Sequence, residues 1–226
     1  MSGEDRTIGV ESAVPAGQKE VPPWRLVSTL GTAGALAGFL IVFVFVATEP
    51  SIKAHKALVL RQAIQEVLKG PASFDTLFVY DGALTEELPA GQDPESTDQI
   101  YVGFGDDGSQ VGFAMVAAEP GFQDIIQLIF GYEAASQRVI GMKVLESLET
   151  PGLGDKIEKD QSFVSEFDGV TSPLLGVKTG RATGDEHEID MITGATISSR
   201  AVIKIINNAI ERYRPLIAAH NGGGAQ

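Results

Sequence analysis

Cysteine is absent from this chain, and histidine is scarce. Without cysteine there can be no disulfides, no thiolate catalysis and no iron–sulfur cluster held by cysteine. Three histidines occur, His55, His187 and His220, and they stand far apart in the sequence. Their spacing matches no zinc-binding pattern, so we expect no metal site.

Positive charge is also in short supply. The 226 residues include 17 Lys and Arg against 30 Asp and Glu, which gives a formal net charge of −13. An acidic surface repels phosphate backbones, so nucleic acid is not an expected partner. The length suffices for a membrane anchor and one compact domain.

One long run, Leu26 to Thr48, contains no charged residue. As a helix it would be about 34 Å long, enough to cross a hydrocarbon core of about 30 Å. Trp24 and Arg25 precede the run, as expected at a membrane interface. A cleaved signal peptide is the alternative, but its apolar region would be shorter and would follow a brief basic segment. The long acidic lead therefore favours an uncleaved transmembrane helix over residues 26–48.

Charges beside this span leave its orientation open. Lys19 and Arg25 precede the span, and Lys53, Lys56 and Arg61 follow it, so the positive-inside count does not favour a cytoplasmic N-terminus. A long downstream domain weakens that count, because large domains translocate largely regardless of charge. The Gly34-x-x-x-Gly38 spacing would allow close packing on another span, although glycine is also common in such helices.

The rest of the chain predicts three parts around the span. We expect a disordered acidic segment over residues 1–25, a folded domain over 50–216 and a flexible tail over 217–226. The domain opens with an amphipathic helix, SIKAHKALVLRQAIQEVLKG, which follows a break at Pro50 and stops at Gly70-Pro71.

Alternating apolar residues then predict a sheet. Residues 99–122 form one expected hairpin, turning at Gly105 to Gly108, and residues 124–147 form a second, turning at Ala134 to Gln137. SFVSEF suggests a short helix, SPLLGVK a further strand, and SSRAVIKIINNAIERYRPL a strong final helix. The predicted class is α+β, with a mostly antiparallel sheet and packed helices.

A threonine-rich turn stands at the entrance of that final helix. It reads Thr193-Gly194-Ala195-Thr196, and Ser198 and Ser199 follow. The unpaired amides of a first helical turn offer donors and partial positive charge, while Gly194 admits close approach of another group. The turn therefore suits a phosphate, which one hydroxyl could carry as an ester. An ordinary Ser or Thr N-cap is the alternative reading.

A second glycine-rich stretch, LETPGLGDKIEKDQSF, runs from Leu148 to Phe163. Pro151, Gly152 and Gly154 make an exposed loop whose backbone amides a flat polar ring could reach. Thr150 and Leu153 add one hydroxyl and one apolar contact. Taken alone, this stretch is better explained by a turn followed by a helix cap.

Together, in this order, the two stretches resemble the covalent FMN-binding domain family. The stretch from Asp190, Asp-x-x-Thr-Gly-Ala-Thr-x-Ser-Ser, is similar to its flavinylation motif, and the stretch from Glu149, Glu-Thr-Pro-Gly-Leu-Gly-Asp-Lys-Ile, looks like its isoalloxazine loop. Well-known members are the G subunit of the Rnf electron-transport complex and the C subunit of the sodium-pumping NADH:quinone reductase. The resemblance covers Leu26 to about Leu216. One departure is Ser147, where many members have histidine.

The resemblance implies a role for each matched residue. Thr196 would be esterified to the phosphate of FMN by a flavin transferase that takes FAD as donor and uses magnesium. That enzyme would recognise Asp190 and the Thr193–Thr196 turn. Lys178, Arg181 and His187, which lie near the motif, are expected to be surface residues. The predicted cofactor-binding set is Asp190, Thr193, Gly194, Ala195, Thr196, Ser198, Ser199, Glu149, Thr150, Gly152, Leu153 and Gly154.

The function implied is that of a flavoprotein subunit in a membrane redox complex of the Rnf or sodium-pumping reductase type. It would relay electrons rather than act as a self-contained enzyme, and we expect no catalytic acid or base. Its partners would be the other subunits, and it would be anchored in the bacterial inner membrane with the FMN domain on the extracytoplasmic side. Two alternatives are a stand-alone sensor or reductase with the same flavin, and an assembly subunit that carries none.

Overall fold

The computed structural model describes residues 22–223. The predicted disorder of residues 1–21 and the last residues of the predicted tail, 224–226, lie outside this range. The chain divides into two compact units, Met1–Ala54 and His55–Gln226.

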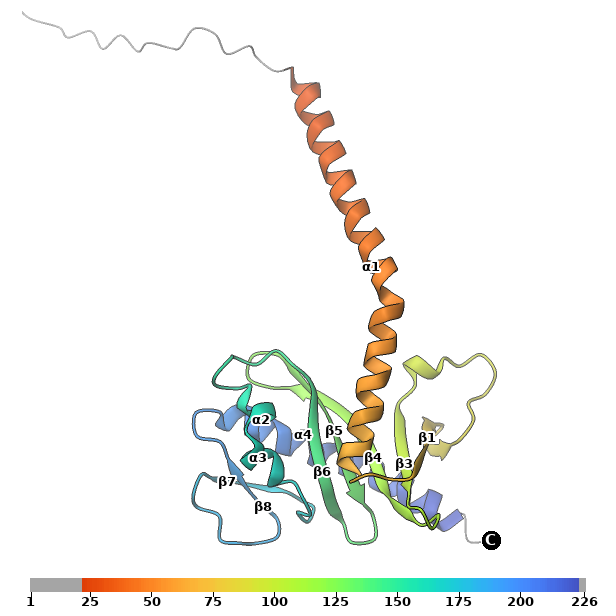
Figure 1. Ribbon diagram of the computed structural model, residues 1–226, viewed down its shortest axis with the longest axis vertical. Helices are drawn as coiled ribbons and strands as arrows, with labels where there is room; N and C mark the ends of the chain where they lie inside the picture. Colours follow the sequence, from red (N-terminus) through yellow and green to blue (C-terminus); the bar gives the residue numbers. More distant parts are fainter. Residues whose placement is uncertain (1–21, 224–226) are drawn as a thin grey trace, which may run out of the picture. The chain divides into compact units, whose positions relative to one another are not determined.

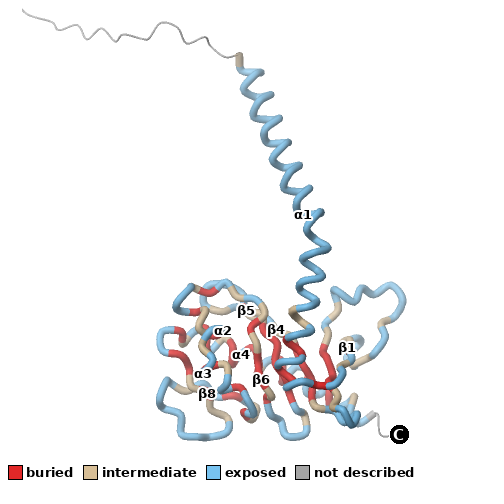
Figure 2. Tube along the Cα trace, in the orientation of Figure 1, coloured by how far each residue is buried: buried red, intermediate tan, exposed pale blue. Residues whose placement is uncertain are grey.

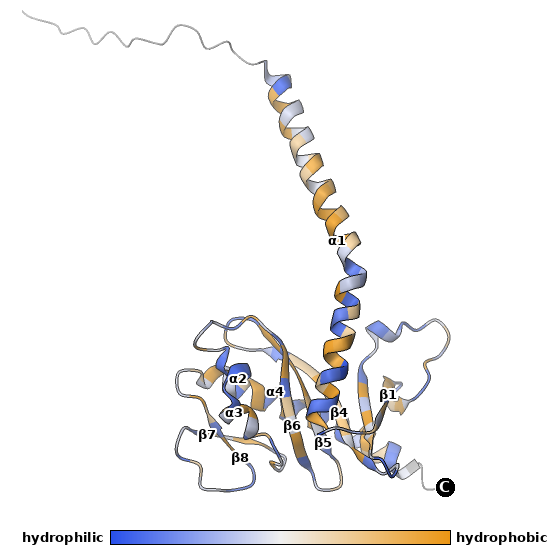
Figure 3. Cartoon of the chain, viewed as in Figure 1, coloured by the Kyte–Doolittle hydropathy of each residue, from blue (hydrophilic) through white to orange (hydrophobic). Residues whose placement is uncertain are grey.

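The first helix, α1, covers the predicted span. It runs from Pro23 to Val67. Among the helices within residues 22–223, it is the one that is long and apolar enough to cross a membrane. Figure 3 shows the orange of apolar residues concentrated in the middle of α1. The predicted break at Pro50 is wrong, because the helix continues through this residue. Proline removes one backbone donor, and here the neighbouring turns carry the helix on without it.

The second unit is built on one antiparallel sheet, and both predicted hairpins are confirmed (Figure 1). The strands follow the order β2-β1-β3-β4-β5-β6. Their bounds are β1 Ser73–Tyr80, β2 Ala83–Thr85, β3 Gln99–Phe104, β4 Gln110–Pro120, β5 Ile125–Glu133 and β6 Arg138–Ser147. A short 3-10 helix, Pro94–Ser96, leads into β3.

Each face of the sheet is covered by a helix. Successive strand residues point to opposite faces, so the sheet supplies two cores. On one face, Tyr101, Ala114 and Ile129 pack with the last turns of α1. On the other face, the sequence neighbours of these three residues pack with α4, Thr196–Gly223. They are Ile100, Val102, Phe113, Met115, Leu128 and Phe130. Figure 2 shows the buried positions gathered along the strands and α4.

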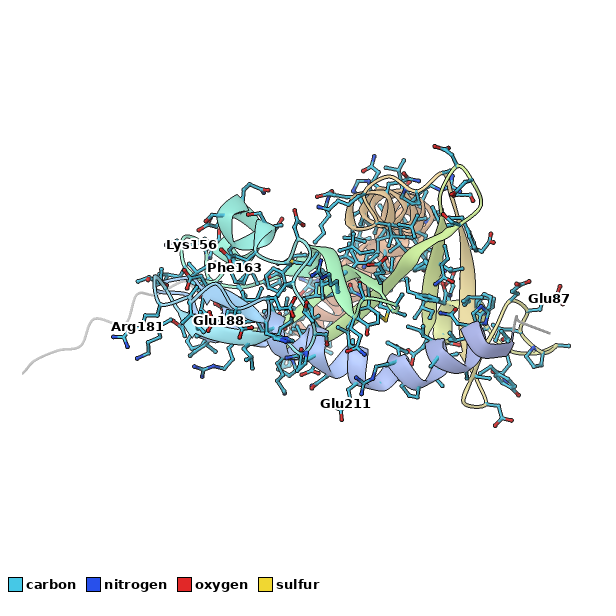
Figure 4. All side chains as sticks on the ribbon, turned by 90° about the horizontal axis from the view of Figure 1, so that it is seen from below. Glu87, Lys156, Phe163, Arg181, Glu188 and Glu211 are labelled. Carbon is cyan, nitrogen blue, oxygen red and sulfur yellow. The ribbon has the colours of Figure 1, made fainter. Side chains whose placement is uncertain are left out.

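Smaller elements complete one end of this unit. They are α2 Lys156–Lys159, α3 Gln161–Ser165, β7 Leu175–Lys178 and β8 Glu188–Met191. Lys156, Phe163, Arg181 and Glu188 mark this end in Figure 4. The strand predicted over 172–178 is confirmed for 175–178, but its pairing is parallel, with β8, in a separate two-stranded sheet.

The final helix begins at Thr196, immediately after the predicted turn, and is longer than predicted. It extends to Gly223, so the expected flexible tail is helical from 217 to 223. Ile217 explains the difference, because it is 1% exposed and continues the apolar face of α4 into the core.

Candidate functional site

The loop that follows β6 is fastened by the side chain of Glu149. One carboxylate oxygen accepts hydrogen bonds from the backbone amides of Phe122, at 2.8 Å, and Gln123, at 3.0 Å. The other accepts one from the Ser198 hydroxyl at 2.7 Å, in the first turn of α4. The Thr150 hydroxyl donates to the side chain of Gln123 at 2.7 Å. Glu149 therefore joins three segments: the β4–β5 turn, its own loop and the start of α4.

Glu149 is 5% exposed, yet these contacts keep it ionised. Burial raises the pKa of Glu149, and the hydrogen bonds from Ser198 and from the amides of Gln123 and Phe122 lower it. The net effect holds the pKa below its ordinary value, because bonds donated to a carboxylate favour the charged form.

Two glycines leave room for this carboxylate. A Cβ atom on Gly121 would lie 2.4 Å from one oxygen of Glu149, and a Cβ on Gly154 would lie 2.5 Å from the other. Both distances are far below a van der Waals contact, so any side chain here would displace the carboxylate. Gly154 of the loop and Gly121 of the β4–β5 turn thus serve the packing of Glu149.

The threonine-rich turn leads directly into α4. Gly194 has φ of +84°, a left-handed conformation that glycine adopts at little cost. Ser199 closes the turn from inside: its hydroxyl donates to the carbonyl of Ala195 at 2.9 Å and accepts from the amide of Ile192 at 3.2 Å. Thr196 is half-buried, and its hydroxyl has one long contact, 3.5 Å, with the carbonyl of Ile192.

The two stretches predicted from the sequence lie side by side. Besides the Glu149–Ser198 bond, Leu153 approaches the other turn, with its Cδ2 3.9 Å from where a Cβ on Gly194 would stand. Since these residues are far apart in the chain, the docking of α4 brings them together.

A third segment, the loop after β7, also contacts the turn. The Thr193 hydroxyl donates to that of Thr179 at 2.9 Å, and the amide of Gly180 donates to Asp190 at 3.1 Å. Thr179 in turn donates to the carbonyl of Met191. The other carboxylate oxygen of Asp190 is buried and has no hydrogen-bond partner within residues 22–223.

The predicted site residues divide into an outer and an inner group. Gly152, Leu153, Thr193 and Gly194 are exposed, and Thr150, Thr196 and Asp190 are half-buried. The inner residues are Glu149, Gly154, Ala195, Ser198 and Ser199, which are buried. Both oxygens of Glu149 are used in bonds beneath the loop, and its place beside a cofactor ring stays a prediction.

Sequence reasoning missed Phe122, Gln123, Thr179 and Gly180. They take part through backbone amides, the Thr179 hydroxyl and the side-chain oxygen of Gln123, and such roles leave no characteristic residue pattern. Of the nearby charged residues, Lys178 and Arg181 are exposed as predicted. His187 is half-buried instead, since its Nδ1 lies 2.9 Å from the carbonyl of Thr171.

Large apolar side chains are exposed around the paired turns. Phe122 is 64% exposed, and Leu148, Leu153 and Ile197 are each more than half exposed. All four adjoin a residue of the Glu149–Ser198 contact or the Gly194 turn. The site thus offers polar backbone at a helix start beside an apolar surface.

Comparison with known proteins shows which family this chain resembles. The profile of the FMN-binding domain matches residues 121–211, from Gly121 through most of α4. The G subunit of the ion-translocating oxidoreductase complex from Shewanella piezotolerans is 30% identical over 80% of this chain and 84% of its own length. The protein of the same name from Methanosarcina acetivorans is 27% identical over 83% of this chain and 92% of its own length.

A solved structure agrees in fold. NqrC of Shewanella oneidensis superposes with a TM-score of 0.63 and 18% identity, covering 74% of this chain and 99% of that one. The matched profile and the fold define an FMN-binding domain behind an N-terminal apolar helix. The chain belongs to the family of G subunits of ion-translocating oxidoreductase complexes.

Proposed function

We propose that this chain is a membrane-anchored flavoprotein subunit that relays electrons through FMN esterified to Thr196, within a membrane redox complex. The observation that carries the proposal is the convergence of the loop at 149–154 with the turn at 193–196. Family membership supports FMN as the group and other subunits as the partners, since the relatives are named as subunits of ion-translocating complexes.

The residues of the turn fit a phosphate ester. The first amides of α4 have no partner within a helix and present partial positive charge, which stabilises an anion. Gly194 adds no side chain above them, and the Thr196 hydroxyl makes only a 3.5 Å contact with the protein. This hydroxyl is therefore the one on the turn that is most weakly held and free to react.

Attachment would proceed by phosphoryl transfer from FAD. The Thr196 oxygen forms a bond to the phosphorus of the FMN half, the pyrophosphate bond breaks, AMP leaves, and the hydroxyl proton passes to solvent. A flavin transferase would supply the catalytic groups and magnesium, while Asp190 and the Thr193–Thr196 turn would be its recognition features. Once bound, FMN supplies the electron-accepting and electron-donating chemistry.

The exposed loop would receive the flavin ring. Leu153 stands next to the turn, while Thr150 in the same loop is half-buried and Gly152 is exposed. An ester bond holds the flavin without any need for high affinity, so one ring edge can stay open toward a neighbouring carrier. This arrangement suits a domain on the extracytoplasmic side, which is the orientation we propose, with residues 26–48 in the inner membrane.

In-gel fluorescence tests the attachment. The full chain is co-expressed with a flavin transferase, denatured, separated on a gel and viewed under ultraviolet light. We expect a fluorescent band for the wild type, no fluorescence for Thr196→Val, which is nearly isosteric but lacks the hydroxyl, and fluorescence for Thr196→Ser. Mass spectrometry should place the added FMN on the peptide that contains Thr196. A dark wild-type band would remove the flavin proposal and favour an assembly subunit.

Gentle solubilisation of the native membrane tests the partners. We expect the chain to co-purify with multi-span redox subunits. Recovery of a fluorescent chain by itself would instead favour a stand-alone sensor or reductase.

A further inference from the structure

The charge of Glu149 is unusual for its surroundings. Its three hydrogen-bond donors, two backbone amides and the Ser198 hydroxyl, are all neutral. The charged side chains on the same three segments are Asp124, Asp155, Lys156 and Arg200. Within residues 22–223, none of them pairs with Glu149. The carboxylate is therefore buried without a cation.

A carboxylate is not the only side chain that could make this fastening. A glutamine of the same shape could make the same contacts, with weaker bonds because they would not be charge-assisted. Its oxygen would accept from the two amides, and its NH₂ group could donate to a reoriented Ser198 hydroxyl. Because the fastening does not require the charge, the charge points to a separate role.

The position of the charge indicates what that role is. The carboxylate lies directly beneath Gly154, next to exposed Leu153, and bonds to the same helical turn that begins with Thr196. A negative charge beneath the loop that would receive the flavin would act through partly desolvated protein, where it is weakly screened. Reduction adds electrons to the flavin, so such a charge makes reduction less favourable.

We propose that Glu149 is a positioning residue with two effects: it fastens the 149–154 loop to the start of α4, and its charge lowers the reduction potential of the flavin. The second effect rests on the proposed attachment of FMN to Thr196. No contact between Glu149 and the flavin is required.

Glu149→Gln separates the two effects. The flavinylated full chain is titrated in detergent, and the midpoint potential is measured from flavin absorbance between pH 6 and 9. We expect the substitution to make reduction more favourable by about tenfold in the equilibrium constant, which is about 30 mV for a two-electron couple. The difference should be constant over this pH range, because the wild-type carboxylate stays ionised throughout.

Asp98→Asn is the matched control. Asp98 is a half-exposed carboxylate that pairs with Arg212, so it also binds α4, but about 21 Å along the helix from Ser198. Its removal changes the net charge by the same amount and should leave the midpoint potential unchanged.

Ser198→Ala tests the fastening without the flavin. Hydrogen exchange of the full chain is followed by mass spectrometry over residues 121–125 and 149–154. We expect both segments to exchange several times faster, although the substitution lies on α4. Unchanged exchange in both segments would overturn the fastening, even if Glu149→Gln could not be purified.

The outcomes separate this inference from the proposed function. Fluorescent Glu149→Gln with the wild-type potential overturns the inference and leaves the attachment intact. A wild-type chain that never acquires FMN overturns the attachment, and the effect on potential with it. A raised potential in both Glu149→Gln and Asp98→Asn would show a general effect of net charge and would also overturn the inference.

Discussion

At the scale of single residues, the space around Glu149 makes Gly154 a sensitive position. An alanine there would bring its Cβ to 2.5 Å from the carboxylate and 2.8 Å from the Glu149 Cβ. Overpacking of this kind costs about 1–3 kcal/mol, so we expect Gly154→Ala to lower the free energy of unfolding by that amount. Denaturant titration measures the loss.

Gly222→Ala is the natural comparison for that substitution. A Cβ at Gly222 would meet no atom within 4 Å, and alanine is favoured over glycine in a helix. Its free energy of unfolding should be at or above that of the wild type. Equal losses in both variants would contradict the packing explanation.

The ionisation of Glu149 predicts a pH dependence of stability. The pKa of this group is lower in the folded chain than its ordinary value, so its stabilisation is fully present above the unfolded pKa of about 4.3. It is lost as the pH falls through the folded pKa. Thermal unfolding of the wild type and Glu149→Gln should therefore converge as the pH falls from 6 to 3. A gap that widens on acidification would contradict this sign.

The residue scale also shows what the sequence can reveal. The turn at 193–196 is predictable because its hydroxyls and glycine stand in one short stretch before a strongly periodic helix. The inward direction of the Glu149 side chain cannot be predicted from the sequence, because it depends on backbone amides in the β4–β5 turn. Any residue except proline could supply such amides.

At the scale of elements, one asparagine joins α4 to the chain that enters β7. The side chain of Asn207 accepts from the amide of Leu174 at 2.8 Å and donates to the carbonyl of the same residue at 2.9 Å. It therefore satisfies both backbone groups of Leu174, which is itself 2% exposed. This pairing fixes where β7 starts, and so where the Thr179 loop meets the Thr193 turn.

Asn207→Ala should accordingly be destabilising. It leaves one donor and one acceptor of the buried backbone unpaired, at a cost of about 1–3 kcal/mol for each group. Asn208→Ala, which removes a single exposed bond to Glu119, should cost less than about 1 kcal/mol. Chemical denaturation of the two neighbouring variants gives the comparison, and equal losses would count against the proposed role of Asn207.

Elements of the main sheet could be predicted, and the small sheet could not. The hairpins at 99–122 and 124–147 show alternation with turn residues between them. The pairing of β7 with β8 is parallel and joins short strands, with mixed exposure, across an irregular loop. Each strand has only four residues, and the alternation of β8 is too short a run to identify a strand, so only β7 was recognised.

At the scale of the whole molecule, the division into two units predicts a simple truncation. Within residues 22–223, the buried apolar side chains all lie at or beyond Ala63. A chain of residues 55–226 therefore keeps them all. We expect it to remain in the supernatant after ultracentrifugation and to unfold in one cooperative transition, whereas the full chain sediments with membranes. Aggregation of the truncated chain would contradict this division.

The contact between the 149–154 loop and the turn before α4 determines at which stage of folding the flavin could be attached. The turn takes its final shape only after Thr179 has reached Thr193 and α4 has docked on the sheet. A transferase that reads this shape would meet its target only in a finished domain. Attached flavin would then serve as a record that folding had been completed.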